Sequence, residues 1–295
     1  MDSVHAKPTR SAYPCSDKGE SSGYHWMRSN GPVSHLPMVD GGARQILNEK
    51  SLRGITDEKV VVIFGPSGMG KSLLSSRLAQ DMKNDEMNWV LHVDLMEKRK
   101  FLNLSASLDD SHHAIEQFAK LCDVKVGTFE FSLVEHSIQN AKPFKVAAIF
   151  DGFDEVDDKC RQFVTKLANE LRATQISKLF LFSRSMCKSE IEDTFHTVAF
   201  ELIGFDEQQQ LGFLRKYWKR NNREMDDAKL DSFAQRTLSR FRASGKYSIT
   251  ENPLLIKMIA EIEEQQLNHL EHGEPDGKTA VIAAKCSSLD VYEKF

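Results

Sequence analysis

The segment from Lys59 to Lys83 contains three sequence patterns in an order that is found in few folds. The run Lys59-Val60-Val61-Val62-Ile63-Phe64 is apolar on both faces, as in a strand buried within a parallel sheet. It stops at Gly65, and from Lys71 onward apolar residues recur at helical spacing. Residues 65–72, which connect the two, match G-x-x-x-x-G-K-[ST] at every fixed position. A strand, a glycine loop and a helix in this order predict the first half of a βαβ unit with a phosphate-binding loop at its turn.

The residue types of this loop suit phosphate chemistry. Glycines have no Cβ, so backbone N–H groups can turn inward and approach phosphate oxygens closely, and the following helix adds its positive N-terminal end. We expect Lys71 to reach the β and γ phosphates of a nucleotide and the Ser72 hydroxyl to bind Mg²⁺. An incidental lysine after a glycine turn is the alternative, although a chance match in a chain this long is expected only about once in a hundred. The predicted nucleotide-binding residues of the loop are Gly65, Pro66, Ser67, Gly68, Met69, Gly70, Lys71, Ser72 and Leu73.

An acidic cluster follows a second intensely apolar strand, residues 145–150. It reads Asp151-Gly152-Phe153-Asp154-Glu155. Because a parallel sheet brings ligands to the carboxyl ends of its strands, the cluster should emerge beside the phosphate loop. We expect Asp151 to contribute to the Mg²⁺ site, directly or through water, and Glu155, with Asp154 beside it, to polarise an attacking water. The alternative is an ordinary strand that ends in an acidic turn.

An arginine follows a third apolar strand, residues 178–182. Ser183-Arg184 comes directly after it. A guanidinium at this position could pair with the γ-phosphate and neutralise charge that develops there, so we count Arg184 among the candidate catalytic residues. A solvated surface arginine is the alternative.

The remaining pattern indicates an α/β protein. Strands alternate with helices up to residue 205, and only helical patterns follow. We therefore expect a three-layer P-loop NTPase fold of the AAA/STAND type, with a mainly parallel sheet followed by a small helical subdomain. The expected parts are a disordered tail over residues 1–42, the nucleotide-binding domain over 43–205 and the helical subdomain over 206–295. Two local expectations are a short helix over Ala43–Leu52 and a solvated loop over residues 97–100.

Charge and composition restrict the possible partners. The net charge is -4 and the pI is near 6.2, so the chain has no global positive field to collect nucleic acid. The five cysteines are scattered, which fits neither a disulfide framework nor a zinc site. No stretch reads as a signal peptide or a membrane span, so we expect a cytoplasmic protein.

Several motifs together make the chain resemble a NACHT domain, from the STAND class of signalling ATPases, over about residues 55–266. They are the phosphate loop, the stretch 151–155, Phe182-Ser183-Arg184, Ile203-Gly204-Phe205 and Glu251-Asn252-Pro253-Leu254-Leu255. The resemblance implies a helical subdomain that closes over an adenine nucleotide, with Arg184 as the sensor arginine and Pro253 against the adenine ring. A proline in the first turn of an ordinary helix explains Pro253 equally well. In this family a winged-helix domain and a repeat array usually follow, and the chain ends at Phe295 before they would be complete. We therefore expect a fragment or a truncated member, with the helical subdomain incomplete at its C-terminus.

The resemblance implies a switch of the NOD-like receptor type that binds ATP or ADP with Mg²⁺ and hydrolyses ATP slowly. In its ATP state such a domain associates with itself, and it serves innate immune or cell-death signalling through an effector that the sequence does not identify. Two other functions stay open at the level of sequence. One is a P-loop phosphotransferase that acts on a small substrate, and the other is a scaffold that binds nucleotide without hydrolysing it.

Overall fold

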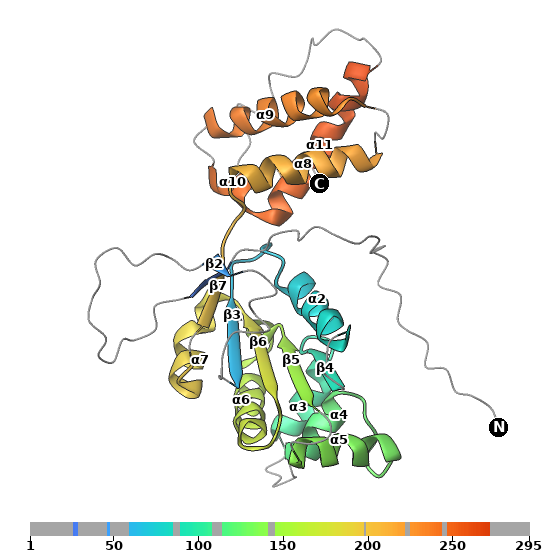
Figure 1. The fold of residues 1–295 in the computed structure, drawn as a ribbon. Coiled ribbons are helices and arrows are strands. Elements are labelled where there is room, and N and C mark those ends of the chain that lie inside the picture. The colour runs from blue at the N-terminus through green and yellow to red at the C-terminus, as the bar shows by residue number, and fades with distance from the viewer. Residues whose placement is uncertain are drawn as a thin grey trace, which may run out of the picture.

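A computed structural model gives the fold of the chain (Figure 1). It describes residues 26–28, 46–47, 59–84, 89–107, 114–140, 145–197, 199–221, 225–243 and 247–271. Within them lies a 7-stranded sheet with the strand order β2-β1-β7-β3-β6-β5-β4. The five strands β3 to β7 pair in parallel, whereas β1 (Trp26–Arg28) runs antiparallel to both β2 (Ile46–Leu47) and β7.

The parallel strands are the apolar runs of the sequence. They are β3 (Val60–Phe64), β4 (Trp89–Asp94), β5 (Val146–Asp151), β6 (Lys178–Ser183) and β7 (Ala199–Leu202). Every residue of β3 and β5 is buried, because helices cover both faces of the sheet. The register pairs Phe64 of β3 with Ser183 of β6, and Asp94 of β4 with Asp151 of β5. The carboxyl ends of these strands therefore meet at one edge of the sheet.

Side chains alternate between two cores along each strand. Val61 and Ile63 pack with Leu74 and Leu78 of α2 (Lys71–Asn84) on one face. Val60, Val62 and Phe64 pack on the other face, against the remaining helices of the domain. Those helices are α3 (Arg99–Ser107), α4 (Ala114–Leu121), α5 (Phe129–Gln139), α6 (Asp158–Ala173) and α7 (Lys188–Phe195). This arrangement confirms the predicted α/β fold with three layers.

A separate helical layer follows β7. It consists of α8 (Glu207–Asn221), α9 (Asp227–Ala243), α10 (Tyr247–Glu251) and α11 (Pro253–Glu271), drawn in orange in Figure 1. Trp218 lies at the centre of its core, where the indole N–H donates to the Ala260 carbonyl at 2.9 Å and the ring meets Phe233 edge to face. The predicted helical subdomain after the sheet is confirmed, and it has hydrophobic core clusters of its own.

Several elements differ from those predicted from the sequence. The helix predicted over Ala43–Leu52 is wrong at its two described residues, which form β2 instead, because they pair with β1. The tail predicted over residues 1–42 contains β1, and its other residues lie outside the described part of the chain. The helix α3 begins at Arg99, within the stretch predicted as a solvated loop. Within the described ranges, no helix is long and apolar enough to cross a membrane.

Candidate functional site

The glycine loop lies between the end of β3 and the start of α2. Gly68 and Gly70 have φ angles of +78° and +84°, a region that residues with a Cβ rarely adopt. The Gly65 amide donates to the Ser183 carbonyl at 3.3 Å, which fastens the start of the loop to β6. The Leu74 amide donates to the Gly70 carbonyl at 2.9 Å, so the regular hydrogen bonds of α2 begin inside the loop. The segment therefore has the strand, turn and helix order that the sequence predicted.

Lys71 folds back over this loop. Its ammonium group donates to the carbonyls of Gly65 at 2.8 Å and Pro66 at 3.0 Å. Burial lowers the pKa of Lys71 below its ordinary value; the carboxylate of Asp154 opposes this shift and the guanidinium of Arg184 adds to it. Lys71 is thus within electrostatic reach of the groups that follow β5 and β6. It is held by backbone carbonyls that a phosphate can replace as hydrogen-bond acceptors.

Asp151 is connected to the first turns of α2. The Ser75 hydroxyl lies 2.9 Å from Asp151 Oδ2, 3.1 Å from His92 Nε2 and 3.0 Å from the Ser72 carbonyl. Ser72 and Ser75 are three residues apart on a helix, so their side chains lie on one face. The structure thereby brings the buried Asp151 close to the turn that carries Ser72.

Ser75 and His92 were not among the residues predicted for the site. Ser75 is fully buried and holds the carboxylate of Asp151, while His92 on β4 reaches the same hydroxyl. Their sequence signal is weak, because a serine within a helix and a histidine within a strand are common. Only the helical spacing from Ser72 could have pointed to Ser75.

Asp154 and Glu155 both pair with Arg184. Asp154 is buried and accepts two bonds from Arg184, at 2.7 Å from the backbone amide and at 3.0 Å from Nε. Glu155 stays 44% exposed, and its carboxylate lies 3.8 Å from the terminal Nη2 of the same arginine. The turn between Asp151 and this pair is made possible by Gly152, whose φ is +79°. The three predicted catalytic groups beyond Lys71 therefore lie together, with Glu155 the more open to water.

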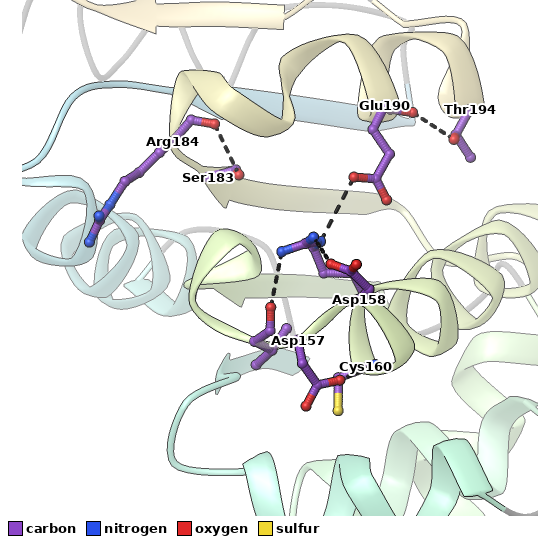
Figure 2. Close-up of polar contacts among 9 residues, drawn as sticks. Asp157, Asp158, Cys160, Ser183, Arg184, Glu190 and Thr194 are labelled. Carbon is purple, nitrogen blue, oxygen red and sulfur yellow. Dashed lines mark hydrogen bonds and ion pairs between the residues drawn. The ribbon is translucent and has the colours of Figure 1, made fainter.

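Arg184 lies apart from the other charged cluster that Figure 2 draws. In Figure 2 its side chain extends away from Asp158 and Glu190, which belong to a separate ion-pair cluster on α6 and α7. A groove of about 620 Å³ opens beside that cluster, with Lys166 and Glu190 in its lining. It contains none of the predicted site residues. We therefore place the candidate site at the strand ends and not in this groove.

Pro253 lies beside the phosphate loop. It is the first residue of α11, and the amide of the next residue, Leu254, donates to the Gly68 carbonyl at 3.2 Å. The side chains of Leu73, at the start of α2, and Leu254 are 61% and 39% exposed. The helical subdomain thus brings an apolar residue and a proline to the loop, and the base-binding role of Pro253 stays a prediction.

The residues present fit a nucleotide with Mg²⁺. Gly68 and Gly70 form a turn that a Cβ would strain, Lys71 supplies a positive charge, and the exposed Ser72 lies one helical turn before Ser75, whose hydroxyl donates to the Asp151 carboxylate. Hard oxygen donors of this kind are what Mg²⁺ prefers, with phosphate oxygens and water as its remaining ligands. In the described part of the chain, no group of three or more His, Cys, Asp or Glu side chains forms another metal site.

Comparison with solved structures concerns the fold alone. A structure titled "Structure of Drosophila ORC bound to DNA" has a similar fold, with a TM-score of 0.51 at 14% identity over 76% of this chain. The match covers 62% of that chain, so this chain spans less than two thirds of its length. "Structure of C. elegans PCH-2" matches with a TM-score of 0.42 at 14% identity, over 75% of this chain and 65% of that one. No curated protein sequence matches.

The family comparison is more specific. The model of the NACHT domain matches residues 59–221, which is more than half of the chain. The matched segment begins at the strand before the phosphate loop and runs through Asp151, Glu155 and Arg184 to the end of α8. With the parallel sheet and the glycine loop described above, this match shows that the chain belongs to the NACHT domain family of P-loop NTPases.

Proposed function

We propose that this chain is a nucleotide-dependent switch that binds Mg-ATP and hydrolyses it slowly. The observation that carries the proposal is the convergence of five charged groups at one sheet edge. Lys71 on the loop is within electrostatic reach of Asp151 and of Asp154, and Arg184 joins Asp154 to Glu155. Such a set serves phosphate binding and water activation together, whereas a structural turn would need neither.

Each residue has a distinct part in the proposed reaction. Lys71 binds the β and γ phosphate oxygens, and the backbone amides of the loop bind the same charges. Bound Mg²⁺, held by Ser72 and Asp151, would neutralise negative charge on the phosphates. Glu155 accepts a proton from the attacking water, because its carboxylate is open to solvent while Asp154 is buried against Arg184.

Arg184 provides the link between nucleotide state and conformation. In the structure its guanidinium is paired with Asp154 and Glu155. A γ-phosphate would compete for the guanidinium and free Glu155 to face water. A switch of this kind needs the triphosphate to favour one arrangement by a few kcal/mol, which two or three charge-assisted contacts can supply.

The wider role follows from the family resemblance. We infer a cytoplasmic protein that associates with further copies of itself through the NACHT domain in the ATP state and acts on a protein effector in innate immune or cell-death signalling. Nucleic acid is not expected as a partner, because the net charge of -4 offers no global attraction to it.

Nucleotide extraction from the purified chain, followed by chromatography, tests the binding part of the proposal. Bound ADP or ATP is expected, and GDP or no nucleotide would count against the switch. Hydrolysis is tested with labelled ATP on the wild type and on Glu155→Gln. The variant should retain ATP and lose roughly 10²- to 10⁴-fold in turnover, which is the range for a positioned general base.

A matched control is Glu130→Gln, which changes an exposed glutamate of α5 in the same way. It should turn over ATP like the wild type. Transfer of the label to an acceptor other than water would favour a phosphotransferase. Equal, negligible turnover in the wild type and Glu155→Gln would favour a scaffold that binds nucleotide without hydrolysing it.

A further inference from the structure

The junction between α10 and α11 is fastened to the phosphate loop by Asn252. This residue is the N-cap of α11, because its Oδ1 accepts from the amides of Leu254 at 3.0 Å and Leu255 at 3.3 Å. Its Nδ2 donates in the opposite direction, to the Ser67 carbonyl of the loop at 2.9 Å. One side-chain amide therefore holds a helix of the subdomain and a peptide of the phosphate loop at the same time.

The second contact involves the backbone of α11. The Leu254 amide, already bonded to Asn252, also donates to the Gly68 carbonyl at 3.2 Å. Two successive carbonyls of the loop, those of Ser67 and Gly68, thus accept hydrogen bonds from the N-terminal turn of α11. No other described element is bonded to either carbonyl.

Because the peptide bond is planar, these contacts also fix the direction of two backbone N–H groups of the loop. In a trans peptide the C=O and the N–H point in opposite directions. Fixing the Ser67 carbonyl toward α11 directs the Gly68 N–H away from α11, and fixing the Gly68 carbonyl does the same for the Met69 N–H. These are amides of the loop that the proposed function assigns to phosphate binding, and they are oriented from outside the loop.

The N-terminal turn of α11 approaches the loop closely at Gly68. A Cβ on Gly68 would lie 2.7 Å from Asn252 Oδ1 and 3.1 Å from Leu254 Cβ. The motif G-x-x-x-x-G-K-[ST] leaves this position free, so the pattern alone does not call for glycine here. Glycine is required at this position because its φ is positive and because α11 approaches it closely.

The junction is also tied to the start of the subdomain. The Phe205 amide donates to the Glu251 carbonyl at 2.8 Å, and Gly204 packs so tightly on Glu251 that a Cβ would lie 2.7 Å from the Glu251 Cβ. Residues 204 and 205 connect β7 to α8. A movement of the helical subdomain about this connection would therefore withdraw Asn252 from the loop.

We propose that Asn252 is a positioning residue that makes the phosphate affinity of the loop depend on the docking of the helical subdomain. The inference rests on the proposed function, because it assigns to Asn252 the orientation of the Gly68 and Met69 amides toward a bound nucleotide. By linkage, nucleotide in the loop stabilises the docked position of α11 to the same extent that docking raises nucleotide affinity.

Asn252→Ser separates this role from helix capping. Serine caps a helix about as well as asparagine and is neutral, but its hydroxyl is too short to bridge from the cap to Ser67. The dissociation constant for ADP, measured by calorimetry, should rise about 3- to 10-fold, which corresponds to the loss of one hydrogen bond. The thermal midpoint of the nucleotide-free protein should fall less for Asn252→Ser than for Asn252→Ala, because serine retains the helix cap. Asn169→Ser on α6 makes the same change away from the loop and should leave both quantities unchanged.

The outcomes distinguish this inference from the proposed function. If the wild type binds no nucleotide, the proposed function fails. If the wild type binds ADP and Asn252→Ser binds it equally well, the function stands and the positioning role is overturned. Hydrogen exchange on the wild type gives a check that needs no variant: adding ADP should slow exchange at the Leu254 and Leu255 amides, and unchanged exchange there would also overturn the inference.

Discussion

The sheet domain and the helical subdomain are built around separate cores, yet they contribute to the site in different ways. The sheet domain supplies charge, because Lys71, Asp151 and Arg184 all follow or face the carboxyl ends of its strands. The helical subdomain supplies hydrogen bonds and apolar contact through the N-terminal turn of α11. Under the proposed function, the sheet domain determines which ligand binds, while the helical subdomain affects how well the loop is arranged to bind it.

Their buried polar groups show the same contrast. In the sheet domain the buried Asp151 and Asp154 are bonded to groups of the site itself, Ser75 and Arg184. In the helical subdomain the buried Glu263 pairs with Arg240, and the Trp218 indole is bonded to Ala260. The polar groups in the second domain serve its own packing, so substitutions there should act mainly on stability and substitutions in the first mainly on binding.

The largest expected effect is on the helical core. Trp218→Ala removes a fully buried indole that contacts Phe233 and donates to Ala260. We expect the free energy of unfolding, measured by urea denaturation, to fall by about 3–5 kcal/mol. Leu104→Ala is the control, because Leu104 on α3 is 69% exposed and its loss should change stability by less than about 0.5 kcal/mol. Similar losses in both variants would contradict the presence of a separate core in the subdomain.

The next effect belongs to the sheet domain. Lys71→Ala removes the ammonium group that caps the loop carbonyls and, in the proposed function, binds the phosphates. ADP affinity measured by calorimetry should fall roughly 100-fold, in line with the loss of one or two charge-assisted bonds. Lys83→Ala, near the other end of α2, alters an exposed lysine and should leave affinity unchanged. Equal affinity in the wild type and Lys71→Ala would remove the loop from nucleotide binding.

The elements that could be predicted from the sequence are those with strong local patterns. Uninterrupted apolar runs such as Val60–Phe64 and Val146–Asp151 became the buried strands, because parallel strands are covered on both faces. Short helices have weaker local patterns, and α7 and α10 are two examples. Within α7, Ile191 and Phe195 are the buried residues, and α10 has only 5 residues. The pairing of β1 with β7 depends on residues far apart in the chain, so no local pattern indicates it.

The same difference holds within the site. Lys71, Asp151 and Arg184 could be placed because each follows a predicted strand at a fixed position, and the topology of a parallel sheet brings strand ends together. The direct pairing of Arg184 with Asp154 could not be foreseen, since it depends on side-chain positions. Asn252 could not be assigned to the loop either. It is separated from Ser67 by 185 residues, and it belongs to the helical subdomain, whereas Ser67 belongs to the sheet domain.

A smaller effect should come from the connection between the two domains. Gly204→Ala would place a Cβ 2.7 Å from the Glu251 Cβ and 2.8 Å from the Glu251 carbonyl oxygen, so the connection and the α10–α11 junction must move apart. We expect a loss of about 1–3 kcal/mol in the free energy of unfolding, typical of overpacking. Because Asn252 adjoins Glu251, ADP affinity should fall as well.

Gly212→Ala tests whether any glycine substitution in this region has that effect. Gly212 lies within α8, where an added Cβ meets nothing within 4 Å. Alanine there should stabilise the protein by up to about 1 kcal/mol through its better helix propensity. A parallel decrease of stability and affinity in both variants would break the link between the connection and the loop.

The smallest expected effect concerns Thr128, which belongs to the sheet domain but lies away from the candidate site. Thr128 is the N-cap of α5, where its hydroxyl accepts from the Phe131 amide at 3.3 Å, and α5 lies at the end of the sheet opposite the helical subdomain (Figure 1). Thr128→Ala should cost about 1 kcal/mol of unfolding free energy, and Thr128→Ser, which retains the accepting oxygen, should cost less. Neither should change ADP affinity, because α5 contributes no group to the strand ends that carry Lys71, Asp151 and Arg184. A loss of affinity in Thr128→Ala would mean that stability anywhere in the sheet domain governs the loop, and that α11 has no special part in arranging it.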